Sequence, residues 1–139
     1  MPQGVQADQD LAREIGRLIE MPRGEFDELV ANLYGALGHR AVRTNATGEH
    51  AINVIVQALN GQKWIVQCKQ WRGAVGESVV REFYAAMQRE QAAQGAIITT
   101  ARFTPKAREW AKGKPIHLYD GAEFLQAMKR IRQRVRQRQ

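Results

Sequence analysis

The stretch TGEHAINVIVQALNGQKWIVQCK, residues 47–69, predicts a β-hairpin. Two runs with the composition of strands, 51–59 and 62–69, flank Asn60-Gly61, a residue pair that is typical of tight hairpin turns. Because hairpin strands run antiparallel, the fold is expected to contain at least one antiparallel pair of strands.

Upstream of the hairpin, apolar residues at helical spacing predict two helices. The first follows Asp8 or Asp10, either of which can cap it, and is a short amphipathic helix that ends before Pro22. The second ends at Gly38, where a left-handed residue is favoured, and a strand at 39–44 follows.

Downstream of the hairpin, helices alternate with strands. The expected elements are a helix from Ser78, a strand at 96–100, a helix from Thr104-Pro105, a strand at 116–119 and a helix from Asp120. Ser78 with Glu77 is interpreted as a capping arrangement, and Asp120 with Glu123 as an acidic capping box. The order α, α, β, β, β, α, β, α, β, α predicts an α/β fold in which helices flank a mixed sheet of about five strands.

Length and composition indicate one globular domain. The chain has 139 residues, of which 44% are hydrophobic and 25% charged. A single cysteine, Cys68, excludes an intramolecular disulfide, and with three scattered histidines it makes no structural zinc site. No long apolar run or signal-peptide pattern is present, so we expect a cytoplasmic protein without membrane segments.

The formal net charge of +7 is concentrated at the carboxyl end. Residues 129–139, KRIRQRVRQRQ, contain six basic residues and no acid, whereas residues 1–128 contain fifteen bases and fourteen acids. Such an arm can bind the phosphates of a nucleic acid, or it can be a solvated helix end, and the sequence leaves both interpretations open.

Several motifs occur in the order of a known family: Phe26-Asp27-Glu28, then TGEHAINVI at 47–55, WIVQCK at 64–69, and GAIITTARFTPKAREWA. Together they resemble the Mrr-like restriction endonucleases, a branch of the PD-(D/E)xK nuclease superfamily, over residues 22–128. The resemblance implies a restriction-endonuclease-like fold and hydrolysis of DNA phosphodiesters with Mg²⁺ or Mn²⁺. The chain then divides into an amphipathic helix at 1–21, a nuclease domain at 22–128 and a basic helical arm at 129–139.

One position departs from the family motif. Where the family reads Gly-Ile-Asp-Val, this chain reads Ala51-Ile52-Asn53-Val54, so an amide stands at the position of the catalytic aspartate. The resemblance assigns catalytic roles to Asn53, Gln67, Lys69 and Asp27, and metal ligation to Asn53, Gln67 and Glu49. Mg²⁺ prefers carboxylate ligands, so the metal is expected to bind weakly and the chain to be inactive or nearly so.

Three accounts of Asn53 remain open at this point. Asn53 is an engineered replacement of the catalytic aspartate that removes its charge and keeps its shape, or it is a natural replacement that left a DNA-binding protein without catalysis. In the third account, Glu49 has taken over the role of the missing aspartate. The leading function is an Mrr-like DNA endonuclease weakened at Asn53. The alternatives are a catalytically silent DNA-binding module and a structure-selective nuclease similar to Holliday-junction resolvases.

DNA is the expected partner, and the expected assembly is a homodimer. No base-reading module is recognisable in the sequence, so specificity would come from a partner protein. The residues expected to contact DNA are Lys129, Arg130, Arg132, Arg134, Arg136, Trp71 and Arg72.

Strand parity makes a geometric prediction about the hairpin. With a plain two-residue loop, Asn53 would lie on the sheet face opposite Gln67 and Lys69, and the motif could not converge. An odd loop, such as Asn60-Gly61-Gln62, or a β-bulge near Asn53 would bring the three onto one face. We expect one of these two devices between residues 53 and 69.

Overall fold

The computed structural model describes residues 3–48 and 50–138, and Glu49 lies outside the described residues. The predicted order of elements is confirmed. The strands are β1 Arg40–Arg43, β2 Val54–Gln57, β3 Lys63–Lys69, β4 Gln94–Thr99 and β5 Ile116–Tyr119. The helices are α1 Gln3–Glu20, α2 Arg23–Ala36, α3 Glu77–Arg89, α4 Pro105–Ala111 and α5 Gly121–Gln137.

The five strands form one mixed sheet in the order β1-β2-β3-β4-β5. β1, β2 and β3 pair in antiparallel fashion, and β3, β4 and β5 pair in parallel fashion. Parallel neighbours require crossover connections, which α3 and α4 supply. The expected α/β fold with a helix-flanked mixed sheet is therefore confirmed.

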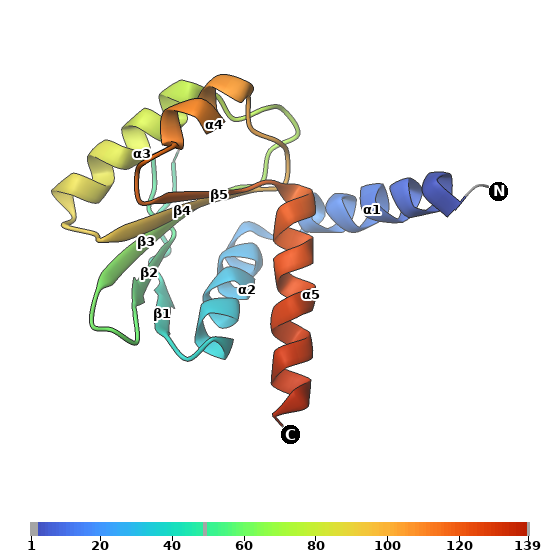
Figure 1. Ribbon diagram of the computed structural model, residues 1–139, viewed down its shortest axis with the longest axis horizontal. Coiled ribbons are helices and arrows are strands. Elements are labelled where there is room, and N and C mark those ends of the chain that lie inside the picture. The colour runs from blue at the N-terminus through green and yellow to red at the C-terminus, as the bar shows by residue number, and fades with distance from the viewer. Residues whose placement is uncertain (1–2, 49, 139) are drawn as a thin grey trace.

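Helices cover both faces of the sheet, α3 and α4 on one and α2 and α5 on the other (Figure 1). Phe26 of α2 and Phe124 of α5 pack on one face, with ring centroids 5.7 Å apart. Phe83 of α3 packs on the other face with Ile65 and Ile97. Full burial of one such side chain contributes about 1.5–3 kcal/mol, so these two cores dominate stability.

The hairpin between β2 and β3 has an odd loop, as parity predicts, but at a different position. Ala58 N donates to Gln62 O at 2.8 Å, so the loop is Leu59-Asn60-Gly61 and not Asn60-Gly61-Gln62. Gly61 has φ +86° and is the last loop residue, the position that a three-residue loop reserves for a left-handed conformation. The expected loop was therefore wrong by one residue, because Gly61 takes the third loop position and not the second.

A bulge is present near Asn53 as well. Val54 pairs with Val66 in the ladder, and Asn53 N also donates to Val66 O, at 2.9 Å. Two consecutive residues of one strand thus oppose a single residue of its partner, which is the arrangement of a β-bulge. β2 begins as a regular strand at Val54, directly after this bulge, so Asn53 is not part of the ladder.

Two predicted helix starts are wrong. α1 begins at Gln3, so Asp8 and Asp10 lie inside the helix and cap nothing. Asp10 instead accepts hydrogen bonds from side chains one turn away, which stabilises the helix interior. α3 is capped by Gly76, not by Ser78, because Val75 still bridges to Phe103 and the chain leaves the sheet immediately afterwards.

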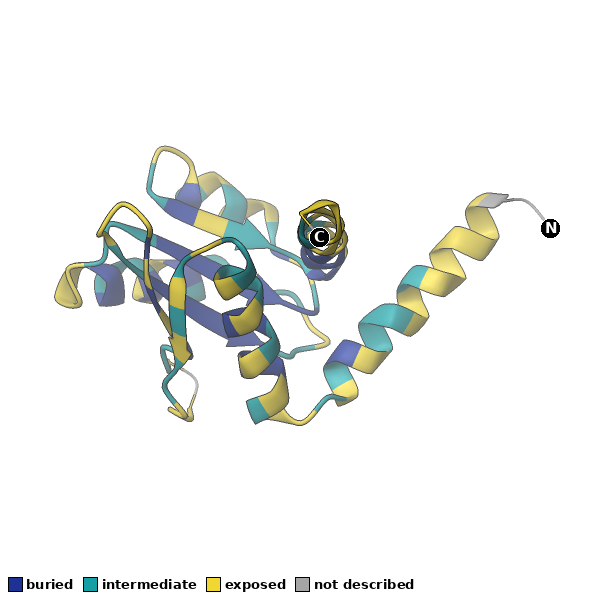
Figure 2. Cartoon of the chain, turned by 90° about the horizontal axis from the view of Figure 1, so that it is seen from below, coloured by how far each residue is buried: buried dark blue, intermediate teal, exposed yellow. Residues whose placement is uncertain are grey.

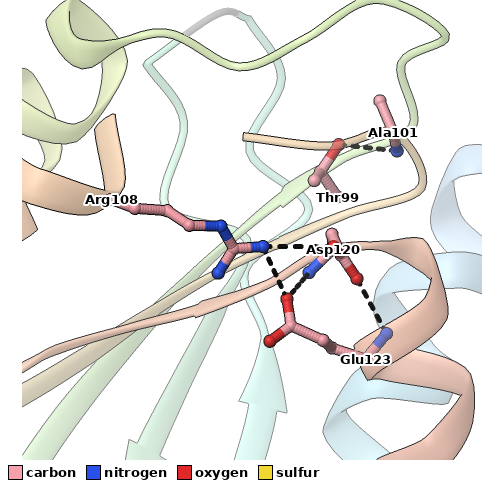
Figure 3. A network of polar contacts seen from close by, with 5 residues as sticks. All are labelled: Thr99, Ala101, Arg108, Asp120 and Glu123. Carbon is pink, nitrogen blue, oxygen red and sulfur yellow. Dashed lines mark hydrogen bonds and ion pairs between the residues drawn. The ribbon is translucent and has the colours of Figure 1, made fainter. Parts of the chain in front are cut away.

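The other two predicted starts are confirmed. Thr104 Oγ1 accepts Ala107 N at 3.1 Å, and Asp120 with Glu123 forms a capping box. Figure 3 shows how Arg108 of α4 joins this box, with Nη2 at 3.1 Å from Asp120 Oδ2 and 2.8 Å from Glu123 Oε1. Burial alone would raise the pKa of Glu123, but the bonds from Arg108 and from the Asp120 backbone lower it. The network ties α4 to the start of α5.

α1 and the end of α5 extend beyond the sheet (Figures 1 and 2). Residues 129–137 continue α5 without a break, and Lys129 Nζ lies 3.7 Å from Glu14 Oε1 of α1. Leu18 is buried at the base of α1, whereas Val5 near its start is 42% exposed. Across the described residues no helix is long and apolar enough to cross a membrane.

We predict that Gly61→Ala lowers the free energy of unfolding by about 1 kcal/mol, because an L side chain at this positive φ is strained. Gly73→Ala is the matched control, since Gly73 has no positive φ and has open space where the new methyl group would lie. Urea unfolding of both variants measures the difference. Equal destabilisation would show that the left-handed loop residue does not set the hairpin.

Candidate functional site

A cleft of about 500 Å³ opens where β3 ends and the α1–α2 turn passes over the sheet. Asp27 of α2 and Lys69 of β3 line it, together with Arg23, Gly48 and Trp71. Arg23 Nη2 lies 3.4 Å from Gly48 O, so the start of α2 contacts the loop that carries the motif. The structure thus gathers two of the predicted catalytic residues, and Glu49 follows Gly48 outside the described residues.

Asp27 is the acidic group of this cleft and is only 4% exposed. Burial raises its pKa above the ordinary value of 3.8, and a hydrogen bond from the Cys68 thiol and the charges of Arg23 and Arg43 oppose that rise. Burial also raises the pKa of Cys68, and the nearby Asp27 charge adds to the effect. Cys68 was interpreted as a small core residue; its thiol also donates to the Asp27 carboxylate.

Lys69 is held in the wall of the cleft. It is 4% exposed, and its Nζ lies 4.5 Å from the centroid of the Trp71 ring, a cation–π distance. Its carbonyl accepts Thr100 N at 3.0 Å, and Thr100 Oγ1 donates to Trp71 O at 2.7 Å. The segment that follows β3 is therefore fixed against β4, which positions the Lys69 cation.

Gln67, the other member of the pair, lines a different cavity of about 310 Å³ on the α3 side of the sheet. His50 and Glu82 border this cavity, and His50 Nδ1 lies 2.8 Å from Glu82 Oε2. Gln67 Nε2 donates to Ala51 O at 3.2 Å, next to the bulge. The alternation of the strand predicts one face for Gln67 and Lys69, yet they line separate hollows, because Lys69 lies at the end of β3 beside the α1–α2 turn.

Asn53 lies between these hollows, next to β3, and is 1% exposed. Its Oδ1 accepts the Cys68 backbone N–H at 2.7 Å. Because that N–H is a donor, the amide must present its oxygen there, and Nδ2 occupies the other position. Within residues 3–48 and 50–138, Nδ2 has no hydrogen-bond partner. A buried donor without a hydrogen-bond partner lowers the free energy of unfolding by about 1–3 kcal/mol.

The described residues do not fit the divalent cation that the resemblance implies. The unsatisfied atom of Asn53 is a nitrogen donor, which cannot ligate a cation, whereas an aspartate would place a carboxylate oxygen there. In the part of the chain that the structure describes, no three His, Cys, Asp or Glu side chains are grouped so as to hold a metal. The described residues therefore provide no carboxylate oxygen at position 53 where the family pattern has one.

The residues expected to contact DNA fall into two groups. Trp71 lines the cleft and Arg72 beside it is exposed. The arm residues are exposed on α5, which starts next to the segment that follows β4, because Gly121 N donates to Ala101 O. At ~1.5 Å per residue, Arg136 lies ~22 Å along the helix axis from Gly121, so the arm leads away from the cleft.

Two contributors to the cleft were missed from the sequence. Arg23 was overlooked because it lies outside the quoted motifs, although an arginine at the first turn of the helix that carries Asp27 was a usable signal. The bond from Cys68 to Asp27 had no signal in the sequence, because it joins the buried residue between Gln67 and Lys69 to a helix that lies far away in the sequence.

Comparison with known proteins agrees with the fold. Residues 18–128 match the family model described as "Restriction endonuclease" (Mrr_cat). The chain belongs to the Mrr-type restriction endonuclease family. A curated relative, the type IV methyl-directed restriction enzyme EcoKMrr of Escherichia coli (strain K12), is 30% identical over 119 residues. The alignment covers 80% of this chain and 39% of EcoKMrr, so this Mrr-type chain spans less than half of that relative.

Solved structures support the same fold. AspBHI, a DNA modification-dependent restriction endonuclease, is similar with a TM-score of 0.68 at 16% identity, over 87% of this chain and 34% of that one. MspJI, solved in complex with a 27-mer oligonucleotide, is similar with a TM-score of 0.65 at 18% identity. The similarity covers 87% of this chain and 31% of the MspJI chain. At such identities the likeness shows the PD-(D/E)xK fold alone.

The raised pKa of Asp27 makes a prediction about stability. Since the folded carboxyl keeps its proton to higher pH than the unfolded one, folding becomes less favourable as pH rises above the ordinary value of 3.8. Asp27→Asn removes this loss of stability at higher pH, and the amide oxygen of the new side chain can still accept the hydrogen bond from the Cys68 thiol. We expect the variant to gain stability relative to the native chain at pH 7, and the gain to shrink towards pH 4.

Urea unfolding between pH 4 and pH 7 measures the effect. Glu28→Gln is the matched control, because Glu28 is the next residue of α2 and its side chain is 52% exposed beside Arg43. It should show no such gain at neutral pH. A loss of stability in Asp27→Asn that grows towards pH 7 would show that the Asp27 carboxylate is stabilised by its neighbours.

Proposed function

We propose that this chain is a DNA-binding Mrr-type endonuclease domain in which Asn53 suppresses metal-dependent hydrolysis. Membership of the family supports a nuclease ancestry. The activity of the whole EcoKMrr protein is not assigned to this chain, because the chain spans 39% of EcoKMrr. The observation that carries the proposal is the Asn53 amide, whose oxygen is held by Cys68 N–H while its nitrogen is buried without a partner among the described residues.

The cleft is suited to a DNA phosphate. Lys69 and Arg23 place two cations beside it, and Arg72 is exposed at its edge. The Trp71 ring offers an apolar surface against a sugar or base. Asp27 is the opposing acidic group, and burial favours its neutral form, which reduces repulsion of a phosphate. These residues bind and orient the backbone without needing a cation.

In this proposal position 53 alone decides between binding and cleavage. A carboxylate would keep the bond from Cys68 N–H and add a second oxygen where Nδ2 now lies. In the nuclease form a divalent cation would supply charge stabilisation at the scissile phosphate, and Lys69 would orient water and offset negative charge. Glu49, outside the described residues, and Gln67 are the further ligands that the family pattern suggests.

We predict that Asn53→Asp raises Mg²⁺-dependent cleavage at least about a hundredfold over a very weak starting rate, because a metal's charge stabilisation is worth several kcal/mol. Plasmid nicking and cleavage of a four-way junction by both forms measure the change. The two substrates also separate duplex from branched-DNA preference. Equal rates in the two forms would contradict the proposal and promote Glu49 to principal ligand.

A second readout does not depend on cleavage. Without metal, the buried carboxylate of Asn53→Asp should lower the melting temperature, and Mg²⁺ should raise it again, whereas the native chain should not respond to Mg²⁺. Adding Lys69→Met to Asn53→Asp is the control: it should keep the Mg²⁺ response and lose the cleavage. A melting temperature of the native chain that rises with Mg²⁺ would show that the amide does not block metal binding.

The basic arm is proposed to add phosphate contacts without specificity. We predict that replacing its six basic residues by Gln weakens binding of a 30-bp duplex and lowers the slope of log K against log salt by at least about 2, since each phosphate contact contributes about 0.9. Substitution is preferable to truncation because Ile131 and Val135 stay in place. Arg13→Gln with Arg17→Gln on α1 is the control, and an unchanged slope in the arm variant would show that the arm is only solvated.

A further inference from the structure

A hollow of about 490 Å³ lies on the α2–α5 face of the sheet, at the end opposite the cleft. Trp64, Gln94 and His117, at the beginnings of β3, β4 and β5, form its floor, and Tyr34 and His39 form its wall. Its volume falls within the ~300–1,000 Å³ of small-molecule sites. Trp64 and Lys69 are five residues apart on β3, so the hollow and the cleft are ~17 Å apart. We call it the aromatic hollow.

Its rings are arranged as a cluster and not as a sealed core. The His39 and Trp64 centroids are 4.6 Å apart, and Tyr34 meets Trp64 edge-on at 6.5 Å. Trp64, His39 and Tyr119 are only partly buried, and His117 is exposed. These residues are therefore in part accessible to solvent, and a flat aromatic ligand that enters the hollow would meet aromatic rings on which it can stack.

Polar groups border the same hollow. Leu59 N donates to His39 Nδ1 at 3.1 Å, which places the proton of the neutral ring on Nε2. His117 Nε2 lies 3.0 Å from Gln94 Oε1, and Trp64 Nε1 donates to Gln62 Oε1 at 3.0 Å. Amide and imidazole groups around stacked rings match the edges of a nucleobase, which alternate donors and acceptors.

The start of the basic arm lines a groove that adjoins the hollow. A narrow groove between α2 and α5 shares Tyr34, Leu37 and Tyr119 with the hollow and reaches Ala127 and Ile131 of α5. Residues 127, 131, 134 and 138 follow a helical spacing of four, three and four, so Arg134 and Arg138 share the face of Ala127 and Ile131. Both arginines are exposed. Arg132 and Arg136 lie on the other side of the helix.

We propose that the aromatic hollow binds an unpaired nucleobase of a nucleic-acid strand, while Arg134 and Arg138 bind its flanking phosphates. Aromatic stacking platforms beside a positively charged track are how proteins hold single strands without reading sequence. Charge complementarity selects a polyanion over an uncharged aromatic ligand, because the arm carries six bases and no acid. The inference goes beyond the proposed function and does not depend on position 53 or on cleavage.

The first test compares two probes without divalent metal, an oligothymidylate 10-mer and an abasic 10-mer with the same phosphates. We expect His39→Ala to weaken binding of the oligothymidylate about tenfold and to leave the abasic probe unchanged, since only the former can stack. His50→Ala, an exposed histidine on the other side of the sheet, is the control. Equal loss for both probes, or no loss for either, would overturn the proposal.

The second test divides the arm by face. Arg134→Gln with Arg138→Gln should lower the salt slope for the oligothymidylate by about 1.4, as expected for two phosphates of a single strand. Arg132→Gln with Arg136→Gln removes the same charge from the other side and should lower it by less than half as much. Equal slopes in the two double variants would show that the arm acts as bare charge, which contradicts the proposed geometry.

The third test uses the native chain, so it does not depend on any variant folding. A 10-mer that carries 5-iodouracil is photo-crosslinked, and the modified residue is mapped by mass spectrometry. We expect adducts at Trp64, Tyr34, Tyr119 or His39, and competition by thymidine monophosphate would separate binding of a free nucleotide from binding of a strand. Adducts at Trp71 alone would place unpaired bases in the cleft and overturn the proposal.

Discussion

The hydrogen bond from the Cys68 backbone N–H to Asn53 Oδ1 is the constraint on which the rest of the site depends. At the bulge a side-chain oxygen, and not a strand carbonyl, accepts this buried N–H, and an unsatisfied N–H there would cost about 1–3 kcal/mol. The bond therefore fixes the orientation of whatever side chain stands at position 53. One other polar atom of that side chain stays available to contact a metal ion or water, and in this chain that atom is the nitrogen Nδ2.

β3 connects the cleft with the aromatic hollow. At its carboxyl end, Lys69 and Asp27 line the cleft, and the Thr100 and Gln70 side chains anchor the adjoining chain. At its amino end, Trp64 forms the floor of the aromatic hollow. Because both ends belong to one buried strand, the two hollows are held at a constant separation by the same core.

Charge is distributed unevenly between these regions. The cleft contains a buried acid beside two cations, whereas the arm on α5 contains bases only. Arg108, by contrast, is used structurally, since it links α4 to the capping box at the start of α5 (Figure 3). That network fixes the start of α5 to α4, and from there α5 extends past the edge of the sheet (Figure 1).

The order of elements and the mixed sheet could be predicted from the sequence, because apolar periodicity, turn residues such as Gly38 and caps such as Thr104 act locally. The family was predicted from the resemblance of several motifs in their order along the chain. Local patterns also predicted an odd loop or a bulge, since side chains alternate along strands. They did not predict that both occur, nor that Gln67 and Lys69 line different hollows. The tertiary structure decided these points, because they depend on which helix covers each face of β3. The orientation of the Asn53 amide was also decided by the tertiary structure. The sequence shows that residue 53 is an asparagine, but the Cys68 N–H that holds its oxygen belongs to the neighbouring strand β3.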